Sequence, residues 1–282
     1  MADWTVSSET GVLTDVLVCP PDHYRWIPTN SIVRRTLAGA QQPSALALAA
    51  QHGELVDALR QGGARVHVLP PEPHLPYMVY TRDSAVVTPW GAVLCQLERP
   101  QRRGEYAGVI DFHGGAFWRK SSAGTLEGGD IHILMPGVAV VGASGGRTDL
   151  AGAGQFAAWL RAEGWEVRIE TFDEHFLHLD VLFCMAAPGL AVACLDVLDP
   201  DFVAWLAGHG IRCIDVPYRD AMALGCNILA LGRGRVVSAR GSARLNAALR
   251  AEGLVVLDPD LSLFTAGGGG PHCLTAPLRR EE

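Results

Sequence analysis

Apolar and polar residues along the chain form a block pattern that occurs four times. Each block opens on a polar residue, continues as an apolar run, turns at a glycine and ends in a second apolar run. The opening polar residues lie 47, 50 and 47 positions apart, and they are Asp83, Asp130, Asp180 and Asn227. Two apolar runs around a short glycine turn are typical of a β-hairpin. The pattern therefore predicts four hairpins of one kind.

A helical pattern that stops at a glycine, followed at once by a short apolar strand, comes after three of these hairpins. The three helix–strand segments span 151–170, 199–216 and 242–258, and segment 44–70 has the same order. The strand expected at 14–20 would pair with the end of the chain and complete a fifth unit. Segment 98–120 takes the place of the helix in its unit, and we expect it to be a surface loop or lid.

A repeat of this length fits a closed radial array of blades, because closure leaves no strand edge exposed. The alternative is an open doubly wound sheet, which needs a helix after every strand rather than hairpins between helices. The hairpins favour the closed array. We therefore expect an α/β fold with a single domain that covers residues 1–282.

Composition narrows the function. The chain has 282 residues, of which 49% are hydrophobic and 19% charged, so it can bury a core and is not intrinsically disordered. A net charge of −7 argues against nucleic acid or an anionic membrane as the partner. No apolar run is long enough to span a bilayer, and the polar start MADWTVSSET does not resemble a signal peptide. We expect a cytoplasmic protein.

Seven cysteines make an odd number and form no CxxC pair, and most lie in apolar runs typical of buried free thiols. We therefore predict reduced cysteines, no metal site and no cofactor. Cys273 differs from the others because it follows the glycine run Gly267 to Gly270, which lets the backbone approach a ligand closely. Cys226 is a second candidate nucleophile, but no glycine run presents it.

In a radial array, equivalent positions of successive blades converge on the central axis. The polar residues at these positions are Asp83, Glu127, Asp130, His178, Asp180 and Asn227. Taken singly, such residues are more often turn, cap or core residues. Their recurrence at one phase of the repeat, together with Cys273, predicts a central polar cavity.

This set of side chains suggests a reaction. A thiolate can attack an electrophilic carbon, and a histidine can protonate the departing amine and then activate water. Glu127 would orient the histidine. The remaining carboxylates are more than acyl transfer needs, and they suit a planar cation such as a guanidinium.

With these residues the chain resembles the guanidino-group-modifying superfamily, which comprises arginine deiminases, dimethylarginine dimethylaminohydrolases and arginine amidinotransferases. The motifs that carry the resemblance are Thr81-Arg82-Asp83, Glu127-Gly128-Gly129-Asp130, His178-Leu179-Asp180 and Gly268-Gly269-Gly270-Pro271-His272-Cys273. They occur in the order found in the family and span most of the chain. The resemblance implies the five-bladed α/β propeller called the pentein fold, with repeated ββαβ units and pseudo-fivefold symmetry.

The resemblance also implies the roles of the residues. Cys273 would be the nucleophile that forms a thiouronium intermediate, His178 the general acid and then base, and Glu127 its orienting partner. The substrate-binding residues would be Asp83, Asp180, Asp130 and Arg147, with Arg147 near the substrate carboxylate.

The resemblance implies a hydrolase of C–N bonds in linear amidines that acts on arginine or a modified, for example methylated, arginine. The products would be a ureido compound and ammonia or an alkylamine. Tyr77 stands where deiminases tend to carry an asparagine that helps to bind the amino-acid end of the substrate, which argues against free arginine. The alternatives are an amidinotransferase that uses an amine in place of water, and a non-catalytic binding protein of the same fold. The expected partner is a small guanidino compound, and a homodimer is compatible with this interpretation.

Overall fold

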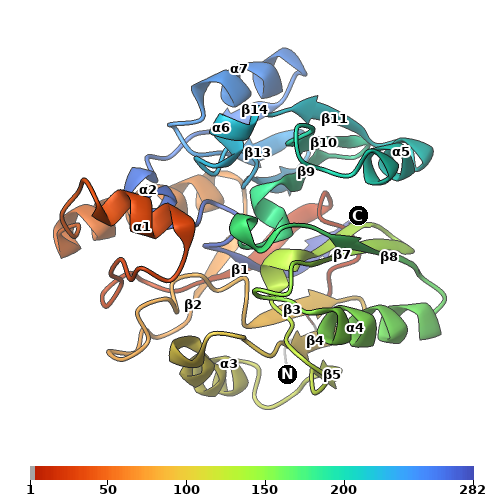
Figure 1. Cartoon of the computed structure of the whole chain (residues 1–282), viewed down its shortest axis with the longest axis horizontal. Coiled ribbons are helices and arrows are strands. Elements are labelled where there is room, and N and C mark those ends of the chain that lie inside the picture. The colour runs from red at the N-terminus through yellow and green to blue at the C-terminus, as the bar shows by residue number, and fades with distance from the viewer. Residues whose placement is uncertain (1–3) are drawn as a thin grey trace.

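The computed structural model describes residues 4–282, and this part of the chain forms five three-stranded sheets with helices outside them (Figure 1). In every sheet the middle strand pairs antiparallel with one neighbour and parallel with the other. The sheets are β15 (Ala276–Glu281), β1 (Val12–Val18) and β2 (Arg65–Val68); β3 (Ala85–Thr88), β4 (Gly91–Leu94) and β5 (Arg119–Lys120); β6 (Ile131–Met135), β7 (Val138–Ala143) and β8 (Glu166–Thr171); β9 (Phe183–Ala187), β10 (Leu190–Ala193) and β11 (Arg212–Asp215); and β12 (Leu229–Gly232), β13 (Arg235–Val237) and β14 (Val255–Leu257).

In each sheet a helix precedes the parallel strand in the connection from the middle strand, and in the first connection α1 (Ser31–Leu37) comes before that helix. The helices that precede the parallel strands are α2 (Ala45–Gln61), α3 (Tyr106–Phe112), α4 (Leu150–Ala162), α5 (Pro200–Gly208) and α7 (Ala243–Ala251). The shorter helices are α1 (Ser31–Leu37), α6 (Tyr218–Ala221) and α8 (Ser262–Thr265), with 3₁₀ turns η1 (Pro100–Glu105), η2 (Gly128–Asp130), η3 (Glu174–Phe176) and η4 (Leu179–Val181). The four predicted hairpins and the four predicted helix–strand segments are confirmed.

The glycines that end the predicted helices and turn the predicted hairpins have left-handed backbone conformations. Gly164 after α4 has a φ of +82°, and Gly210 after α5 has a φ of +74°. In the hairpins, Gly137 has a φ of +87° and Gly189 a φ of +70°. Only glycine adopts this region without steric cost, so these positions fix where each element stops.

The fifth sheet joins the two ends of the described chain, as predicted. Val12 of β1 lies opposite Glu281 of β15, and Leu17 lies opposite Ala276. Three contacts between strands join neighbouring sheets: β9 lies next to β12, β12 next to β1, and β15 next to β3. The turns η2 and η4 contact each other in the same inner region. The segments that lead into the first strands are thereby brought together.

Segment 98–120 differs from its expectation. It is not a loop, because it contains η1, α3 and the strand β5, which pairs with β4 and completes the second sheet. Polar and arginine-rich sequence suggested exposure, yet Arg102 is only 2% exposed and lies in the interior. Its guanidinium pairs with Asp83, which lies outside this segment, so the local sequence pattern does not reveal the contact.

Four apolar clusters fill the space between the sheets and the helices, with Phe156, Phe183, Phe202 and Phe264 among the fully buried side chains. Within residues 4–282, no helix has both the length and the apolar character needed to cross a membrane.

Two glycines of α4 test how closely this helix packs against the segment that contains Thr125. A Cβ atom on Gly152 would lie 1.9 Å from the carbonyl oxygen of Thr125, whereas a Cβ atom on Gly154 would meet nothing within 4 Å. We expect Gly152→Ala to lower the free energy of unfolding by about 1–3 kcal/mol through overpacking. Gly154→Ala should raise it by about 0.5–1 kcal/mol, because alanine has the higher helix propensity.

Urea denaturation of both variants measures these changes. Equal effects of the two substitutions would contradict the tight approach of α4 to Thr125.

Candidate active site

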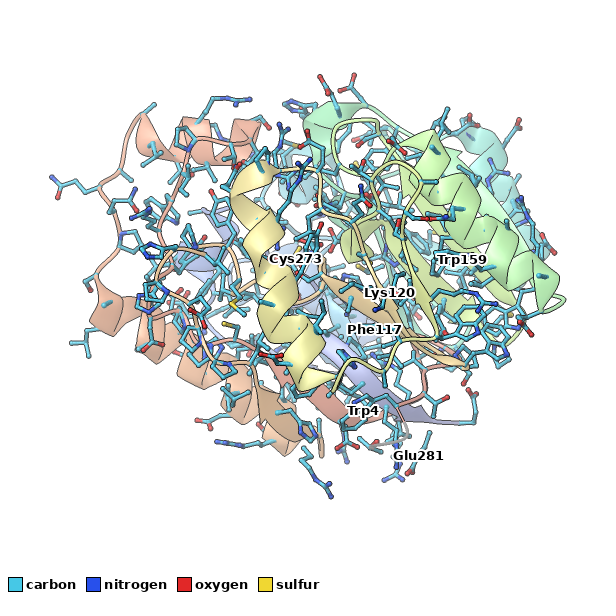
Figure 2. All side chains as sticks on the ribbon, turned by 90° about the horizontal axis from the view of Figure 1, so that it is seen from below. Trp4, Phe117, Lys120, Trp159, Cys273 and Glu281 are labelled. Atoms are coloured by element: carbon cyan, nitrogen blue, oxygen red, sulfur yellow. The ribbon has the colours of Figure 1, made fainter. Side chains whose placement is uncertain are left out.

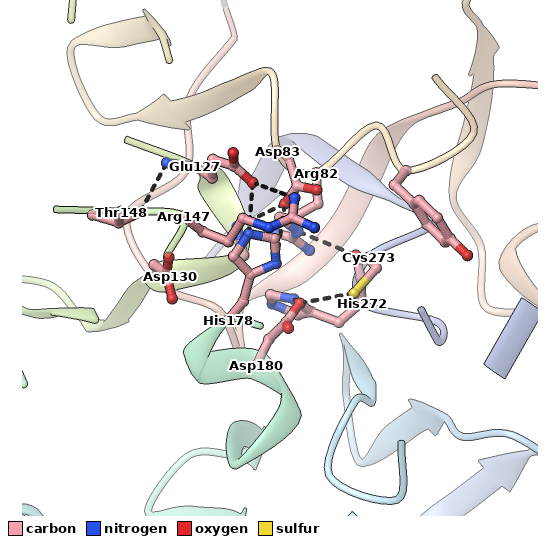
Figure 3. Close-up of polar contacts among 12 residues, drawn as sticks. Arg82, Asp83, Glu127, Asp130, Arg147, Thr148, His178, Asp180, His272 and Cys273 are labelled. Carbon is pink, nitrogen blue, oxygen red and sulfur yellow. Dashed lines mark hydrogen bonds and ion pairs between the residues drawn. The ribbon is translucent and has the colours of Figure 1, made fainter. Parts of the chain in front are cut away.

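The predicted polar residues all lie in the segments that lead into the first strand of a sheet. Asp83 precedes β3, Glu127 precedes β6 through η2, and His178 and Asp180 precede β9 through η4. Asn227 precedes β12, and Cys273 precedes β15. Figure 3 shows that several of these side chains from different sheets point toward one another, and Cys273, labelled near the middle of the view in Figure 2, is buried.

The carboxamide of Asn227 holds the glycine-rich loop in place. Its Oδ1 accepts hydrogen bonds from the backbone N–H groups of Gly270, His272 and Cys273, at 3.1, 3.1 and 3.2 Å. Its Nδ2 donates to the Asp180 carbonyl at 3.2 Å and to Cys273 Sγ at 3.1 Å. Asn227 is fully buried, so these bonds also satisfy its polar atoms.

The thiol of Cys273 faces a carboxylate in a buried environment. Sγ donates a hydrogen bond to Asp180 Oδ2 over 3.1 Å, and Cys273 is 4% exposed. Burial raises the pKa of this thiol well above its ordinary value, and the charges of Asp180 and Asp83 raise it further. Burial and these two carboxylates therefore favour the neutral thiol, and a positive charge close to Sγ would favour the thiolate.

The two oxygens of Asp180 have different surroundings. Oδ2 accepts from Cys273 Sγ and also from His272 Nδ1, which lies 2.9 Å away. Oδ1 has no hydrogen-bond partner among the described residues although it is buried. Burial raises the pKa of Asp180, but His272, His178 and the thiol outweigh that effect and lower it to about 2. An ionised carboxylate with one free oxygen thus lies beside the thiol.

His178 and Glu127 form a buried ion pair. His178 Nε2 lies 2.7 Å from Glu127 Oε2, and His178 Nδ1 lies 3.8 Å from Asp83 Oδ1. Burial is the largest single influence and lowers the pKa of His178, but Asp83, Asp130 and Glu127 together raise it to about 10. The imidazole is therefore protonated at neutral pH and can act as an acid.

Glu127 is held in its charged form from two sides. Burial raises its pKa, whereas Arg147 and His178 lower it, and the net pKa is below the ordinary value. Arg147 Nη1 donates to Glu127 Oε2 over 3.3 Å, and the backbone N–H of Glu98 donates to Oε1 over 2.9 Å. These contacts orient the carboxylate toward His178.

Asp83 is bound by an arginine of the chain itself, which was not predicted. Arg102 Nη1 donates to Asp83 Oδ2 over 2.6 Å, and its remaining donors reach Glu105 and the carbonyls of Tyr77 and Tyr80. Asp83 Oδ1 accepts from the N–H of Gly129 at 3.1 Å and retains a lone pair. The spacing Arg102-x-x-Glu105 is a sequence signal for the ion pair between these two residues, but it does not indicate the contact of Arg102 with Asp83.

Asp130, one of the predicted substrate-binding residues, is fully buried. Its Oδ1 accepts from the backbone N–H of Leu179 at 2.7 Å, and neither Asp130 nor Asp180 is among the residues that line the pocket at Cys273. Burial raises the pKa of Asp130 to about 7. Its contacts fix the turn that carries His178.

A narrow pocket of about 30 Å³ is lined by Cys273 among others, and a wider cavity of about 320 Å³ adjoins some of the same residues. The residues common to both linings are Asn30, Arg147 and Leu177. Tyr77 lines the narrow pocket, but its hydroxyl is already engaged, since it accepts from the N–H of Ile27 at 3.0 Å and donates to its carbonyl at 2.7 Å. Tyr77 therefore offers its ring rather than a free hydroxyl.

Pocket residues that the sequence did not indicate come from outside the repeat. Asn30 caps α1 and accepts from the N–H of Val33 at 2.8 Å, and Leu177 has a φ of +66° beside His178. Neither carries a motif signal, because each reaches the pocket only through the tertiary fold.

The carboxylates near the thiol pocket already pair with arginines, which disfavours a metal ion there. Donor atoms of Asp83, Glu127 and His178 lie within 4.8 Å of one another. Arg102 and Arg147 pair with two of these three groups, so their charge is already neutralised.

Comparison with known proteins identifies the family of the chain. A family model described as N,N dimethylarginine dimethylhydrolase, eukaryotic, matches residues 28–280. The uncharacterized protein YkgA of Bacillus subtilis is 31% identical over 279 residues, which cover 98% of this chain and 95% of YkgA. The N(G),N(G)-dimethylarginine dimethylaminohydrolase of Mycobacterium tuberculosis is 29% identical over 229 residues, covering 77% of this chain and 70% of that enzyme.

Among solved structures, the N-terminal domain of ArgZ, a cyanobacterial arginine dihydrolase, in a mutant form bound to its substrate, superimposes with a TM-score of 0.80 at 22% identity. The match covers 94% of this chain and 98% of that one, which establishes a common fold. The chain therefore belongs to the N,N-dimethylarginine dimethylhydrolase family of the guanidino-group-modifying superfamily and is a hydrolase of C–N bonds in amidines.

Proposed function

We propose that the protein hydrolyses the guanidino group of arginine or a modified, for example methylated, arginine through a covalent intermediate on Cys273. The observation that carries this proposal is the buried thiol held between Asn227 Nδ2 and Asp180 Oδ2, beside an Asp180 oxygen that lacks a partner among the described residues. A guanidinium supplies both a donor for that oxygen and a positive charge for the thiol.

In the first half of the reaction, the guanidinium would bind to Asp180 Oδ1 and to the remaining lone pair of Asp83 Oδ1. Its charge offsets the carboxylates that raise the pKa of Cys273, so the thiol loses its proton to bulk water. The thiolate attacks the guanidinium carbon and forms a C–S bond. His178, protonated at neutral pH, gives its proton to the departing nitrogen as the C–N bond breaks, and ammonia or an alkylamine leaves.

In the second half, neutral His178 would take a proton from water, whose oxygen attacks the thiouronium carbon. The C–S bond then breaks with its electron pair on sulfur, the hydroxyl proton of the adduct passes to the released thiolate, the ureido product leaves and His178 is again protonated. Glu127 supports both halves, because its charge favours the imidazolium and its contact fixes the ring. Asp130 would act only by positioning, through the backbone of Leu179.

The wider cavity supports a substrate with an amino-acid end. Its lining includes Arg34, Arg99 and Arg147 as well as Asp173 and Glu174. Basic groups suit a carboxylate and acidic groups suit an ammonium group. The engaged hydroxyl of Tyr77 supports a substrate whose inner end is contacted by an aromatic ring, such as a methylated guanidine.

We further propose that the five sheets close into one propeller domain with pseudo-fivefold symmetry. The identical strand order of all five sheets and the contacts between their first strands support closure. Seven free cysteines support a reducing compartment such as the cytoplasm.

A substrate panel tests the proposed reaction. Arginine, monomethylated and dimethylated arginines, citrulline and simple guanidino acids are incubated with the protein, and products are identified by mass spectrometry with and without an added amine such as glycine. We expect a ureido product and an amine, at a rate that added amine leaves unchanged. Cys273→Ser should lower kcat by at least about 10³-fold, whereas Cys226→Ser, a buried cysteine outside the thiol pocket, should not.

Labelling with a haloacetamidine followed by peptide mapping locates the nucleophile. Modification at Cys226, or Cys273→Ser with wild-type turnover, would exclude Cys273. Transfer of the amidino group to the added amine would show the alternative transferase reaction.

A second test concerns the ionisation of the thiol. Ultraviolet absorbance of the thiolate is titrated with pH for the free protein and for a complex with a guanidinium ligand that is not turned over, and the Cys273→Ser signal is subtracted. Burial, Asp180 and Asp83 raise the thiol pKa in the free protein, so the ligand's charge should lower it by about one unit or more. An unchanged titration would rule out activation by the substrate.

A third test uses the pH dependence of kcat. His178 must be protonated to act as the acid, so activity is expected to fall as the pH rises through its pKa of about 10. Glu127→Gln keeps a hydrogen-bonding side chain but removes its negative charge. Because Glu127 is one of the carboxylates that raise the pKa of His178 against the effect of burial, this pKa should fall. The alkaline fall should therefore move to lower pH by about one unit or more, with a loss of about 10² in kcat.

The control for this test is Glu170→Gln, since Glu170 is a buried carboxylate of β8 that pairs with Arg168 away from the pocket. Profiles of Glu127→Gln and wild type that coincide would remove His178 as the titrating acid.

A further inference from the structure

A second group of potential ligands lies behind the thiol. His132 of β6, Cys184 of β9 and His272, which immediately precedes Cys273, each contribute one donor atom, and these atoms lie within 4.8 Å of one another. The three residues are at most 2% exposed. The proposed reaction uses none of them directly, and they come from segments far apart in the sequence, so no ligand spacing could reveal them.

Both imidazoles of this group have one hydrogen-bonded nitrogen and one nitrogen without a hydrogen bond. His132 Nδ1 lies 3.2 Å from Glu9 Oε2, and His272 Nδ1 lies 2.9 Å from Asp180 Oδ2. The Nε2 atoms of both rings are buried and have no hydrogen-bond partner among the described residues. Glu9 Oε1 lies 3.6 Å from His272 Nε2, which is too long for a hydrogen bond.

Two buried ring nitrogens without partners in the described part of the chain need an explanation, because such atoms are nearly always satisfied. Histidines that bind a metal typically donate the other ring N–H to a carboxylate, which fixes the ring and its tautomer. Glu9 and Asp180 are placed in this way on His132 and His272. The nearby thiol of Cys184 completes a donor set of two imidazoles and one sulfur.

We propose that His132 Nε2, His272 Nε2 and Cys184 Sγ form a binding site for a thiophilic d¹⁰ metal ion, Cu⁺ or Zn²⁺, in the interior of the protein. Thiolate and imidazole are the ligands that such ions prefer. Binding releases the thiol proton of Cys184 and forms one metal–sulfur and two metal–nitrogen bonds, with no change of oxidation state.

The charges around this site favour the monovalent ion. Glu9 and Asp180 are the carboxylates, and Arg82 and Arg280 are buried guanidinium groups close to Glu9. These four charges cancel. Cu⁺ with the Cys184 thiolate keeps the sum at zero, whereas Zn²⁺ adds one positive charge to a buried region, so Cu⁺ should bind more tightly.

The site is coupled to the thiol pocket through Asp180. The same oxygen that accepts from His272 Nδ1 accepts from Cys273 Sγ. A metal on the other nitrogen of His272 would hold that imidazole, and hence Asp180, in one position. A small cavity of about 20 Å³ lies beside Glu9 and is also lined by Arg82 and Arg280.

Metal titration of the reduced whole protein tests the site. Cu⁺, delivered anaerobically and measured by competition with a chromophoric chelator, and Zn²⁺ are titrated separately. We expect one ion per chain, with Cu⁺ bound more tightly, and X-ray absorption at the copper edge should show one sulfur and two nitrogen neighbours. Cys184→Ser, His132→Gln and Glu9→Gln should each lower the affinity by about 10- to 100-fold.

Cys194→Ser is the matched control, because Cys194 is equally buried but outside this group, and its affinity should equal that of wild type. Cys273→Ser should also bind one ion, which separates the site from the thiol pocket. Circular dichroism confirms that each variant is folded, and Glu9→Gln leaves all three ligands in place if a ligand variant unfolds.

Failure of the wild-type protein to bind either ion would overturn the proposal. So would binding that Cys273→Ser abolishes and Cys184→Ser retains, because the ion would then lie in the thiol pocket.

Discussion

The carboxamide of Asn227 is the interaction on which the site depends. The loop that carries Cys273 is rich in glycine, and three of its backbone N–H groups share one amide oxygen, which sets its position. The same side chain contacts the sulfur and the Asp180 backbone. One buried residue thereby sets both the place of the thiol and its distance from the carboxylate.

Around that amide, buried carboxylates are bound by cationic side chains of the protein. Arg102 offsets Asp83 and Glu105, and Arg147 with His178 offsets Glu127. Asp180 differs from these carboxylates in its hydrogen bonds, because Oδ2 accepts from a histidine and a thiol while the buried Oδ1 has no hydrogen-bond partner among the described residues. A buried carboxylate oxygen needs a donor, so Oδ1 is the atom that a cationic ligand can satisfy.

The sequence was sufficient for the parts of the structure that depend on local patterns. Hairpins, helix ends and their spacing follow from apolar runs and from glycines such as Gly137 and Gly164, whose positive φ angles are needed where the chain turns. The phase of the polar residues then followed from the repeat. The sequence was insufficient where a contact depends on distant partners. Arg102 is buried only because Asp83 and Glu105 receive it, and the group formed by His132, Cys184 and His272 draws on three separate segments.

The pairing of β15 with β1 has a consequence for folding. Val12 lies opposite Glu281, so this sheet depends on contacts between residues very far apart in the sequence, and contacts of this kind form slowly. Cys273 lies in the turn that leads into β15, and its thiol reaches Asp180 only when that strand has docked. The other four sheets are built from continuous stretches of chain, so a folding intermediate can contain all of them and still lack an assembled nucleophile. The appearance of thiol reactivity during refolding would therefore mark the last pairing step rather than the collapse of the chain.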